Sequence, residues 1–194
     1  MKSIAVYTAP TAEPLSFDEA KAYLRIDTDD EAPMLVTMIQ AAREWCQNYC
    51  KRTFMATTYT LTFDNFPASG CAIKLPYPPL TSITHVKYYD SSGTQQTWSA
   101  SNYSADTSSE PGRLLPAYNV VYPSVRPAEN MVEIRYIAGY SSVATVPTSI
   151  KQAMLLLVAH MYEMRQPEIT GTIISKVDFS IKALLDSYRI YEFV

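Results

Sequence analysis

The chain has 194 residues with a formal net charge of −3, and charged residues make up only 18% of it while hydrophobic residues make up 47%. Tight binding of phosphate backbones needs clustered Lys and Arg, but the densest basic pair is Lys51-Arg52, which argues against a protein that grips DNA directly. A chain with so little charge has much neutral surface, and such surface favours association with other subunits.

The expected lack of targeting signals and the odd number of cysteines predict a protein made in the cytoplasm. The most apolar run, Ala153 to Ala159, is far shorter than the ~20 residues that a membrane-spanning helix needs. No long apolar stretch follows Met1, so we expect no signal peptide. Three cysteines, an odd number, then predict reduced thiols inside a cell: Cys46, Cys50 and Cys71.

Composition divides the chain into three parts. Residues 1–53 and 147–194 read as helical, whereas 54–146 holds few charges and most of the prolines and tyrosines. We therefore predict an α+β fold, with a helical core from the N- and C-terminal helices and an inserted antiparallel β-rich region.

Two helices are expected in the first part. Ser16 and Glu19 form a capping box, which starts a short helix over 17–25. A second helix begins after the acidic run 29–31, where negative charge complements the helix dipole, and ends at Lys51-Arg52. Its apolar stripe at spacings of three and four predicts a buried face, made of Leu35, Met38, Ile39, Ala42, Trp45, Cys46 and Tyr49.

Apolar and polar residues alternate in the middle part, which predicts strands. Strands are expected at 58–63, 83–89 and 131–137, and 94–98 returns beside 83–89 as a hairpin through the turn Asp90 to Gly93. Prolines punctuate the connections, because proline cannot donate to a sheet ladder.

The third part predicts two more helices. The first runs from Val146-Pro147 to about Arg165 and should pack on the 30–50 helix through a wide stripe, made of Ile150, Met154, Leu157, Val158 and Met161. Residues 168–176 are expected to form a loop, after which Asp178 caps a last helix reaching about Arg189.

No set of residues predicts catalysis or a cofactor. We interpret His85 and His160 as packed or edge residues, since no acid, base or nucleophile pattern accompanies them. Cys46 and Cys50 have a spacing that suits two zinc ligands, but no second Cys or His pair completes a tetrahedral site. We therefore predict no catalytic residue, no metal and no cofactor.

Two further clusters have a functional and a structural interpretation. The acidic cluster of Asp27, Asp29, Asp30 and Glu31 suits a cation site, yet a helix start explains it better. The tyrosines of the middle part suit a sugar-binding platform, but strand tyrosines more often pack within a sheet.

The order and spacing of many short segments resemble the head–tail connector proteins of long-tailed bacteriophages and prophages. The resemblance covers nearly the whole chain, at residues 7–16, 19–21, 24–27, 39–44, 49–52, 74–80, 86–90, 93, 137–140, 146–147, 150–153, 158–165 and from 178 onward. It implies a non-enzymatic subunit of the virion neck, assembled in the host cytoplasm. About twelve copies would form a ring under the portal protein, closed by head-to-tail contacts.

The resemblance also implies partners. These are the portal, a tail-completion or tail-terminator protein, and DNA that passes through the lumen without specific binding; no membrane is involved. Two alternatives stay open at this point. One is another neck or tail-completion protein, and the other, from a different class, is a Tyr-rich carbohydrate-binding module.

The segment from Asp178 to Val194 is the candidate docking region. Apolar residues at a chain end are usually held against something, and here they are Ile181, Leu184, Leu185, Tyr188, Tyr191 and Phe193. One hypothesis places them in the chain's own core. The other, which follows from the resemblance, lays them as a helix on the portal or on a neighbouring subunit.

Overall fold

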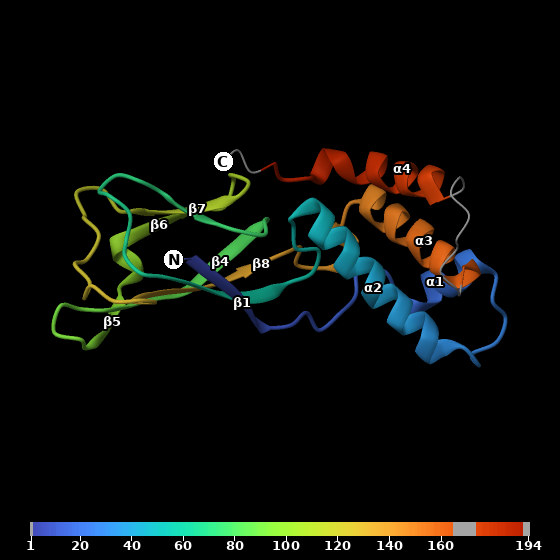
Figure 1. Cartoon of the computed structure of the whole chain (residues 1–194), viewed down its shortest axis with the longest axis horizontal. Coiled ribbons are helices and arrows are strands. Elements are labelled where there is room, and N and C mark those ends of the chain that lie inside the picture. Colours follow the sequence, from blue (N-terminus) through green and yellow to red (C-terminus); the bar gives the residue numbers. More distant parts are fainter. Residues whose placement is uncertain (1, 165–173, 192–194) are drawn as a thin grey trace. The chain divides into compact units, whose positions relative to one another are not determined.

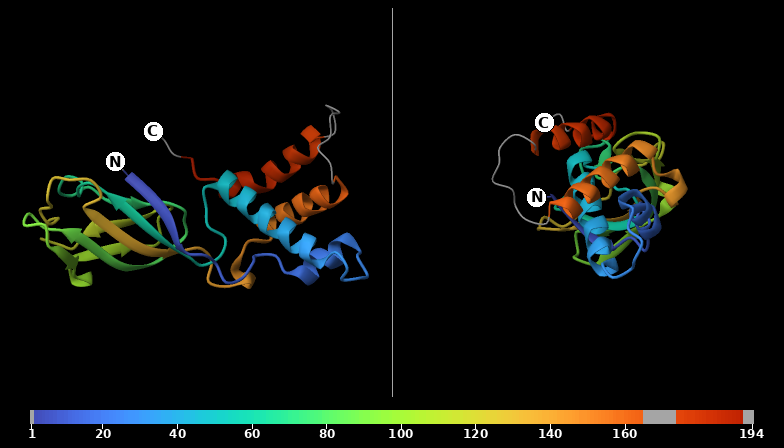
Figure 2. Two further views of the ribbon diagram at one scale, coloured as in Figure 1. Left: turned by 60° about the horizontal axis from the view of Figure 1, so that its bottom comes forward. Right: turned by 90° about the vertical axis from the view of Figure 1, so that its right-hand side faces the viewer.

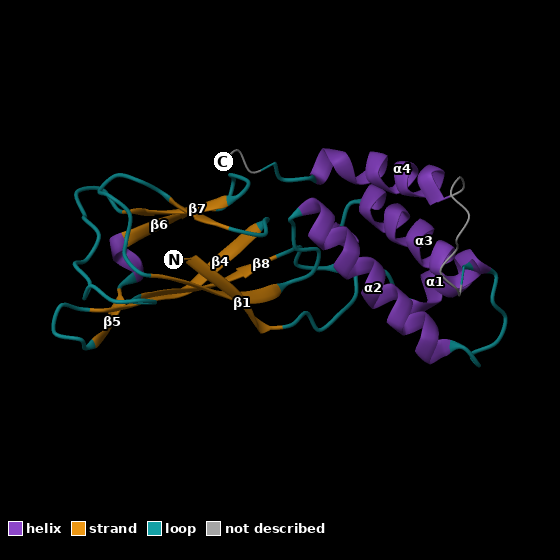
Figure 3. Cartoon of the chain, viewed as in Figure 1, coloured by secondary structure: helices purple, strands orange, loops and turns teal. Residues whose placement is uncertain are grey.

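The computed structural model describes residues 2–164 and 174–191 (Figure 1). The chain divides into two compact units, each built from separate stretches of sequence. A β unit comprises the residues up to Pro10 together with Ala56–Ser141, and a helical unit comprises Thr11–Met55 together with Ser142–Val194. Figure 3 shows the α-helices in one unit and the strands in the other, together with one short helical turn among the strands, and the predicted α+β class is confirmed.

The helical unit contains four α-helices among the described residues: α1 (Phe17–Leu24), α2 (Ala32–Cys50), α3 (Thr148–Glu163) and α4 (Ile174–Leu185), with 3₁₀ turns η2 (Val143–Thr145) and η3 (Asp186–Tyr188). The predicted capping box is present. The Glu19 amide donates to Ser16 Oγ over 3.1 Å, and the Ser16 amide donates to the Glu19 carboxylate over 2.8 Å. These bonds satisfy two amides that the first turn would leave without partners.

The last helix begins earlier than predicted. Asp178 lies inside α4, so it is not the N-cap, and part of the expected loop at 168–176 is helical. The helix begins at Ile174, four residues before the Asp178 that the sequence suggested as its cap. The rest of that expected loop, up to residue 173, lies outside the described residues.

Helix α2 packs against α3, and α3 packs against α4, which confirms the predicted contact between the two long helices. Two residues were misplaced in that prediction. Trp45 is 37% exposed and Leu157 is only partly buried, because both lie at the margins of their apolar stripes. The buried residues of the three helices are Leu35, Ile39, Ala42, Cys46, Cys50, Ile150, Ala153, Met154, Val158, Ile181 and Leu185.

The β unit is made of strands β1 (Lys2–Thr8), β2 (Thr57–Phe63), β3 (Ile73–Leu75), β4 (Leu80–Tyr89), β5 (Gln95–Trp98), β6 (Tyr103–Asp106), β7 (Gly112–Pro116) and β8 (Val132–Ala138), with a 3₁₀ turn η1 (Ala100–Asn102). A five-stranded sheet has the order β1-β2-β8-β4-β5, and a three-stranded sheet has the order β3-β7-β6. All the strand pairs are antiparallel. The predicted β4–β5 hairpin is present, whereas β1, β3, β6 and β7 were not predicted.

Strand β1 differs most from the expectation, since residues 1–53 read as helical. Its residues Lys2 to Val6 run beside Phe63 to Tyr59 of β2 in regular register, and an irregularity follows before Thr8. Strand β1 therefore belongs to the β unit although it precedes the helices in sequence, as the blue strand in Figure 2 shows.

The two sheets share one hydrophobic core. Alternation buries Leu61 of β2, Ile134 of β8 and Leu114 of β7 in the same cluster, as period-two patterning requires. Gly112 is needed for this packing, because a Cβ at that position would overlap the side chain of Leu80. Along the described parts of the chain, no helix is long and apolar enough to span a membrane.

Candidate interaction sites

The predicted docking residues do not form one exposed surface. Ile181 is 2% exposed and Leu185 is fully buried, so both pack inside the helical unit. Leu184 and Tyr188 are partly buried, and Tyr191 is exposed. Phe193 lies outside the described residues. Among the described members of the set, Leu184, Tyr188 and Tyr191 are the ones that a partner can reach.

The segment after α4 is held to the end of α2 by polar contacts. The Tyr49 hydroxyl donates to Asp186 Oδ1 over 2.6 Å, and this bond raises the pKa of the Tyr49 phenol. The Arg52 guanidinium donates to the Tyr188 carbonyl over 3.1 Å, and the Ile190 amide donates to the Cys50 carbonyl over 2.9 Å. The end of the described chain therefore follows the C-terminus of α2.

Aromatic rings and an arginine form a stack beside these contacts. The rings of Trp45 and Tyr49 lie parallel, with centroids 5.6 Å apart and an interplanar angle of 1°. The Arg189 guanidinium lies 4.7 Å from the Tyr49 centroid and 5.1 Å from that of Tyr191. Trp, Tyr and Arg are the residues that most often carry binding energy in protein interfaces. We call Trp45, Tyr49, Arg189 and Tyr191 the aromatic–arginine stack.

Sequence reasoning did not identify this stack, because it assigned Trp45 to the core. The i, i+4 spacing of Trp45 and Tyr49 was visible in the sequence and places two rings side by side on one helix face. The sequence did not indicate that Arg189 and Tyr191 lie against that face of α2, because their position depends on how α4 packs.

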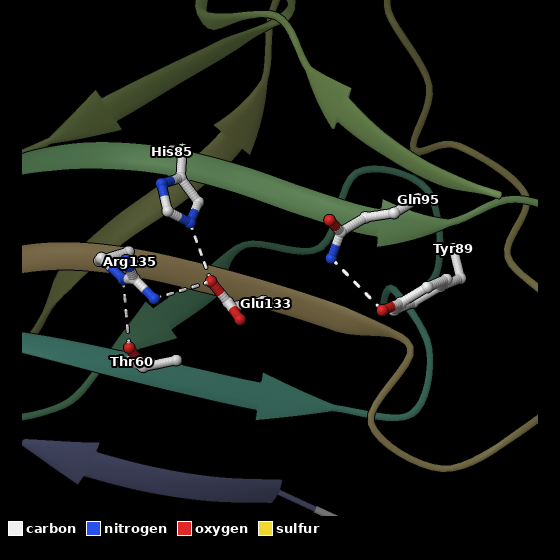
Figure 4. A network of polar contacts seen from close by, with 6 residues as sticks. All are labelled: Thr60, His85, Tyr89, Gln95, Glu133 and Arg135. Carbon is white, nitrogen blue, oxygen red and sulfur yellow. Dashed lines mark hydrogen bonds and ion pairs between the residues drawn. The ribbon is translucent and has the colours of Figure 1, made fainter. Parts of the chain in front are cut away.

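Polar side chains cover the outer face of the five-stranded sheet (Figure 4). His85 Nε2 lies 2.9 Å from Glu133 Oε1, and Arg135 lies 3.3 Å from the same oxygen. Arg135 also donates to Thr60 Oγ1 over 3.4 Å. The His85–Glu133 and Arg135–Thr60 pairs run across neighbouring strands and stabilise the sheet, whereas Arg135 and Glu133 both belong to β8. The contact given for His85 is thus a carboxylate of the neighbouring strand, and the other histidine, His160, is partly buried on α3.

The two helix cysteines are unsuited to metal binding or redox chemistry. Burial raises the pKa of the Cys46 thiol to about 12 and that of Cys50 to about 11, and a thiol must lose its proton to act as a ligand or nucleophile. Across residues 2–164 and 174–191, no group of three or more His, Cys, Asp or Glu side chains is arranged to hold a metal ion. Cys71 is exposed.

The acidic cluster and the tyrosines have structural partners. Asp29 forms an ion pair with Lys21 at 2.6 Å, and Glu31 accepts a 2.6 Å hydrogen bond from Tyr162. Tyr59 stacks on both Tyr77 and Tyr136 inside the β unit, with centroids 5.3 and 5.7 Å apart. These rings therefore contribute to packing and do not form an open platform.

One hollow opens on the β unit, with a volume of about 510 Å³. Two connecting segments line it, residues 65–69 and 121–125, and Phe66 and Tyr122 stack on each other within them at 5.1 Å. The exposed side chain of Val121 stands at its rim.

The model of the head completion protein family matches residues 13–191. The chain belongs to the head completion protein family. This membership confirms the connector-type family that the sequence segments indicated. The matched range includes residues of both units, although strand β1 precedes it, so most of the chain and not one motif carries the family assignment.

Solved structures share the fold of this head completion protein from end to end. A chain in the neck of an empty gene transfer agent particle, computed with C6 symmetry, is 22% identical with a TM-score of 0.81, over 99% of this chain and 97% of that one. A chain in the neck of the native particle, computed with C12 symmetry, is 21% identical with a TM-score of 0.75, over 99% and 97%. A third, in the virion of the native particle, is 20% identical with a TM-score of 0.78, over 98% and 97%. No curated protein matches the chain.

Proposed function

We propose that this head completion protein is a structural subunit of a phage-type neck. About twelve copies close into a ring by head-to-tail contacts, and the ring lies under the portal protein and receives a tail-completion or tail-terminator protein on its other side. DNA passes through the lumen without specific binding. The subunit has no catalytic step to perform, and its place is the virion neck.

The observation that carries this proposal is the likeness of the complete chain to neck chains, over 99% of its length with a TM-score of 0.81, within a family defined by head completion. The net charge of the chain also supports the proposed passage of DNA through the ring. A net charge of −3 with no basic cluster suits a surface past which DNA must slide, because counterion release from clustered Lys and Arg would hold the DNA.

The C-terminal segment and the aromatic–arginine stack are the proposed portal-docking surface. Ile181 and Leu185 anchor the segment to the helical unit, while Leu184, Tyr188 and Tyr191 are open to a partner; Phe193 belongs to the proposed set by its sequence alone. Exposed Trp45 and Arg189 extend the same surface. Large rings lose little conformational entropy on burial, so they bind strongly for their area.

Electron microscopy tests the ring. Purified chain, alone and after addition to tailless heads, should give closed rings seated on the portal vertex. Heads that bind no chain, or chain that remains monomeric even on heads, would contradict the proposal. Image classification would give the number of copies directly.

Point variants test the docking surface better than truncation does. Removal of the residues after Lys176 takes away buried Ile181 and Leu185, so it should destabilise the helical unit by several kcal/mol whether or not the segment docks. Tyr191→Ala removes an exposed ring instead, and should leave the melting temperature nearly unchanged while weakening attachment to heads at least tenfold, about 1.4 kcal/mol. Trp45→Ala should weaken attachment as much, and should also lower the melting temperature because only 37% of Trp45 is exposed.

A matched control is Tyr118→Ala, which removes a 93% exposed ring from the β unit. Heads should capture it as well as they capture the natural sequence. If Trp45→Ala and Tyr191→Ala also attach normally, the portal contacts another surface.

A further inference from the structure

Strand β1 is a long sheet edge with few of the features that normally protect one. In the five-stranded sheet β1 stands at the end of the order, so β2 is its one partner among the described strands. Every second residue of such an edge points its N–H and C=O groups away from the sheet. Figure 4 shows β1 at the margin, beyond β2 and β8.

Most side chains of β1 are also exposed to solvent. Val6 is 57% exposed and Tyr7 is 61% exposed. Ile4 and Val6 oppose Leu61 and Tyr59 of β2, which are core residues, so Val6 continues the apolar face of the sheet. Its exposure follows from the lack of a neighbouring strand beyond β1.

Natural edge strands are usually short or carry proline or charge. In β1 the run from Ser3 to Thr8 holds neither proline nor a charged residue, and its one charge is Lys2 at the start. The other sheet edges are shorter and more polar. Strand β5 is four residues, Gln95 to Trp98, and β6 is four residues ending in Asp106, which is paired with Arg113.

We infer that β1 is an interaction edge, and that a partner protein of the assembly adds an extended strand to it. The inference rests on the proposed neck function for the existence of such a partner. The added strand would bond to the outward backbone groups from Ser3 to Val6 and alternate in character, with apolar residues beside Ile4 and Val6 and small or polar residues beside Ser3 and Ala5. This mode of recognition takes affinity from the backbone and specificity from alternate side chains.

The lengths of the edge strands favour a different protein as the partner of β1 over a second copy of this chain. Among the described strands, the other sheet edges are β5 and β6 with four residues each and β3 with three, whereas β1 has seven. Each of these strands is too short to pair along the whole of β1. Two β1 strands facing each other would need a two-fold axis, which neighbours in a head-to-tail ring do not have.

Hydrogen exchange on the natural sequence is the primary test. In the free chain the outward amides of β1 should exchange rapidly, and in assembled necks they should slow on the order of 100-fold. Rings that assemble with these amides still exchanging at the free rate would overturn the inference while leaving the neck function intact. Absence of rings would instead contradict the neck function.

A charged residue placed on β1 tests the inference in a second way, through incorporation of the chain into necks. Val6→Lys should fold normally, because the side chain is exposed, but should lower incorporation into complete necks at least about tenfold. Tyr118→Lys, at a more exposed ring of the same unit, is the control and should incorporate normally. Normal incorporation of Val6→Lys would count against the inference.

Cross-linking identifies the occupant. Val6→Cys in a Cys71→Ser background, labelled with a benzophenone maleimide, should link to a different protein when assembled necks are irradiated. A link to another copy of this chain, or within the chain, would overturn the choice of occupant.

Discussion

The Arg135 guanidinium lies 3.6 Å from the centroid of the Tyr7 ring. Arg135 belongs to β8 and Tyr7 to β1, and β2 lies between those strands, so this contact spans β2 and holds the edge strand to the middle of the sheet. The same guanidinium reaches Glu133 and Thr60, which fixes its position beneath the ring.

Loss of this contact should loosen β1. Tyr7→Leu removes the aromatic face, and the free energy of opening β1 should fall by about 0.5–1 kcal/mol, seen as faster exchange of β1 and β2 amides. Tyr7→Phe is the matched control, since it keeps the ring and should behave like the natural sequence. Equal exchange in Leu and Phe variants would show that the ring contributes only apolar area.

Gly112→Ala should destabilise the β unit by about 1–3 kcal/mol, because the added methyl overlaps Leu80 in a filled core. Urea unfolding followed by tryptophan fluorescence of buried Trp98 measures it. Leu80→Ala creates room, so Gly112→Ala should cost less in that background. Additive costs in the double variant would place the strain elsewhere.

The different burial of Met154 and Leu157 on α3 predicts different losses of stability when each is replaced by alanine. Met154→Ala should cost roughly 2–5 kcal/mol because Met154 is fully buried. Leu157→Ala should cost clearly less, since Leu157 is partly exposed. Thermal unfolding followed by circular dichroism of the helices compares them. The reverse ranking would contradict the packing of α3.

Asp90 makes the β4–β5 turn sensitive to acid. Hydrogen bonds from Ser92 and Gln96 and from the Thr94 amide lower the pKa of its carboxyl from 3.8 to about 2. A lowered pKa means that the stabilisation is present above pH 4 and disappears as the pH falls through 2. Asp90→Asn should therefore open the hairpin more readily at pH 6, with the difference from the natural sequence vanishing near pH 2. Amide exchange of residues 91–97 measures it, and a difference independent of pH would exclude this carboxylate as the cause.

Local signals in the sequence predicted local structure well. The Ser16–Glu19 capping box and the alternation in β2 and β8 each involve neighbouring residues, and the structure has them. Residues with the same local signal can still be misassigned. Trp45 continues an apolar stripe, yet it lies at the edge of the stripe and stacks on Tyr49 in an exposed position.

Strand β1 shows why other parts could not be predicted. Only Ile4 and Val6 alternate with Ser3 and Ala5 in it, and such a short run is a weak signal for a half-buried strand. Its partner β2 begins only at Thr57, beyond both helices α1 and α2. The aromatic–arginine stack has the same origin, since Arg189 reaches Tyr49 only through the packing of α4.

The five-stranded sheet cannot be completed until its last strand in the sequence leaves the ribosome. Strand β8 pairs with both β2 and β4, yet it is the last strand of the sheet in the sequence. While the chain is being synthesised, β1 can pair with β2, and β4 can pair with β5, but these two pairs remain separate until Val132 to Ala138 emerge. Between the release of β2 and the release of β8, the nascent chain must therefore keep two apolar sheet faces from associating with other nascent chains on the same polysome.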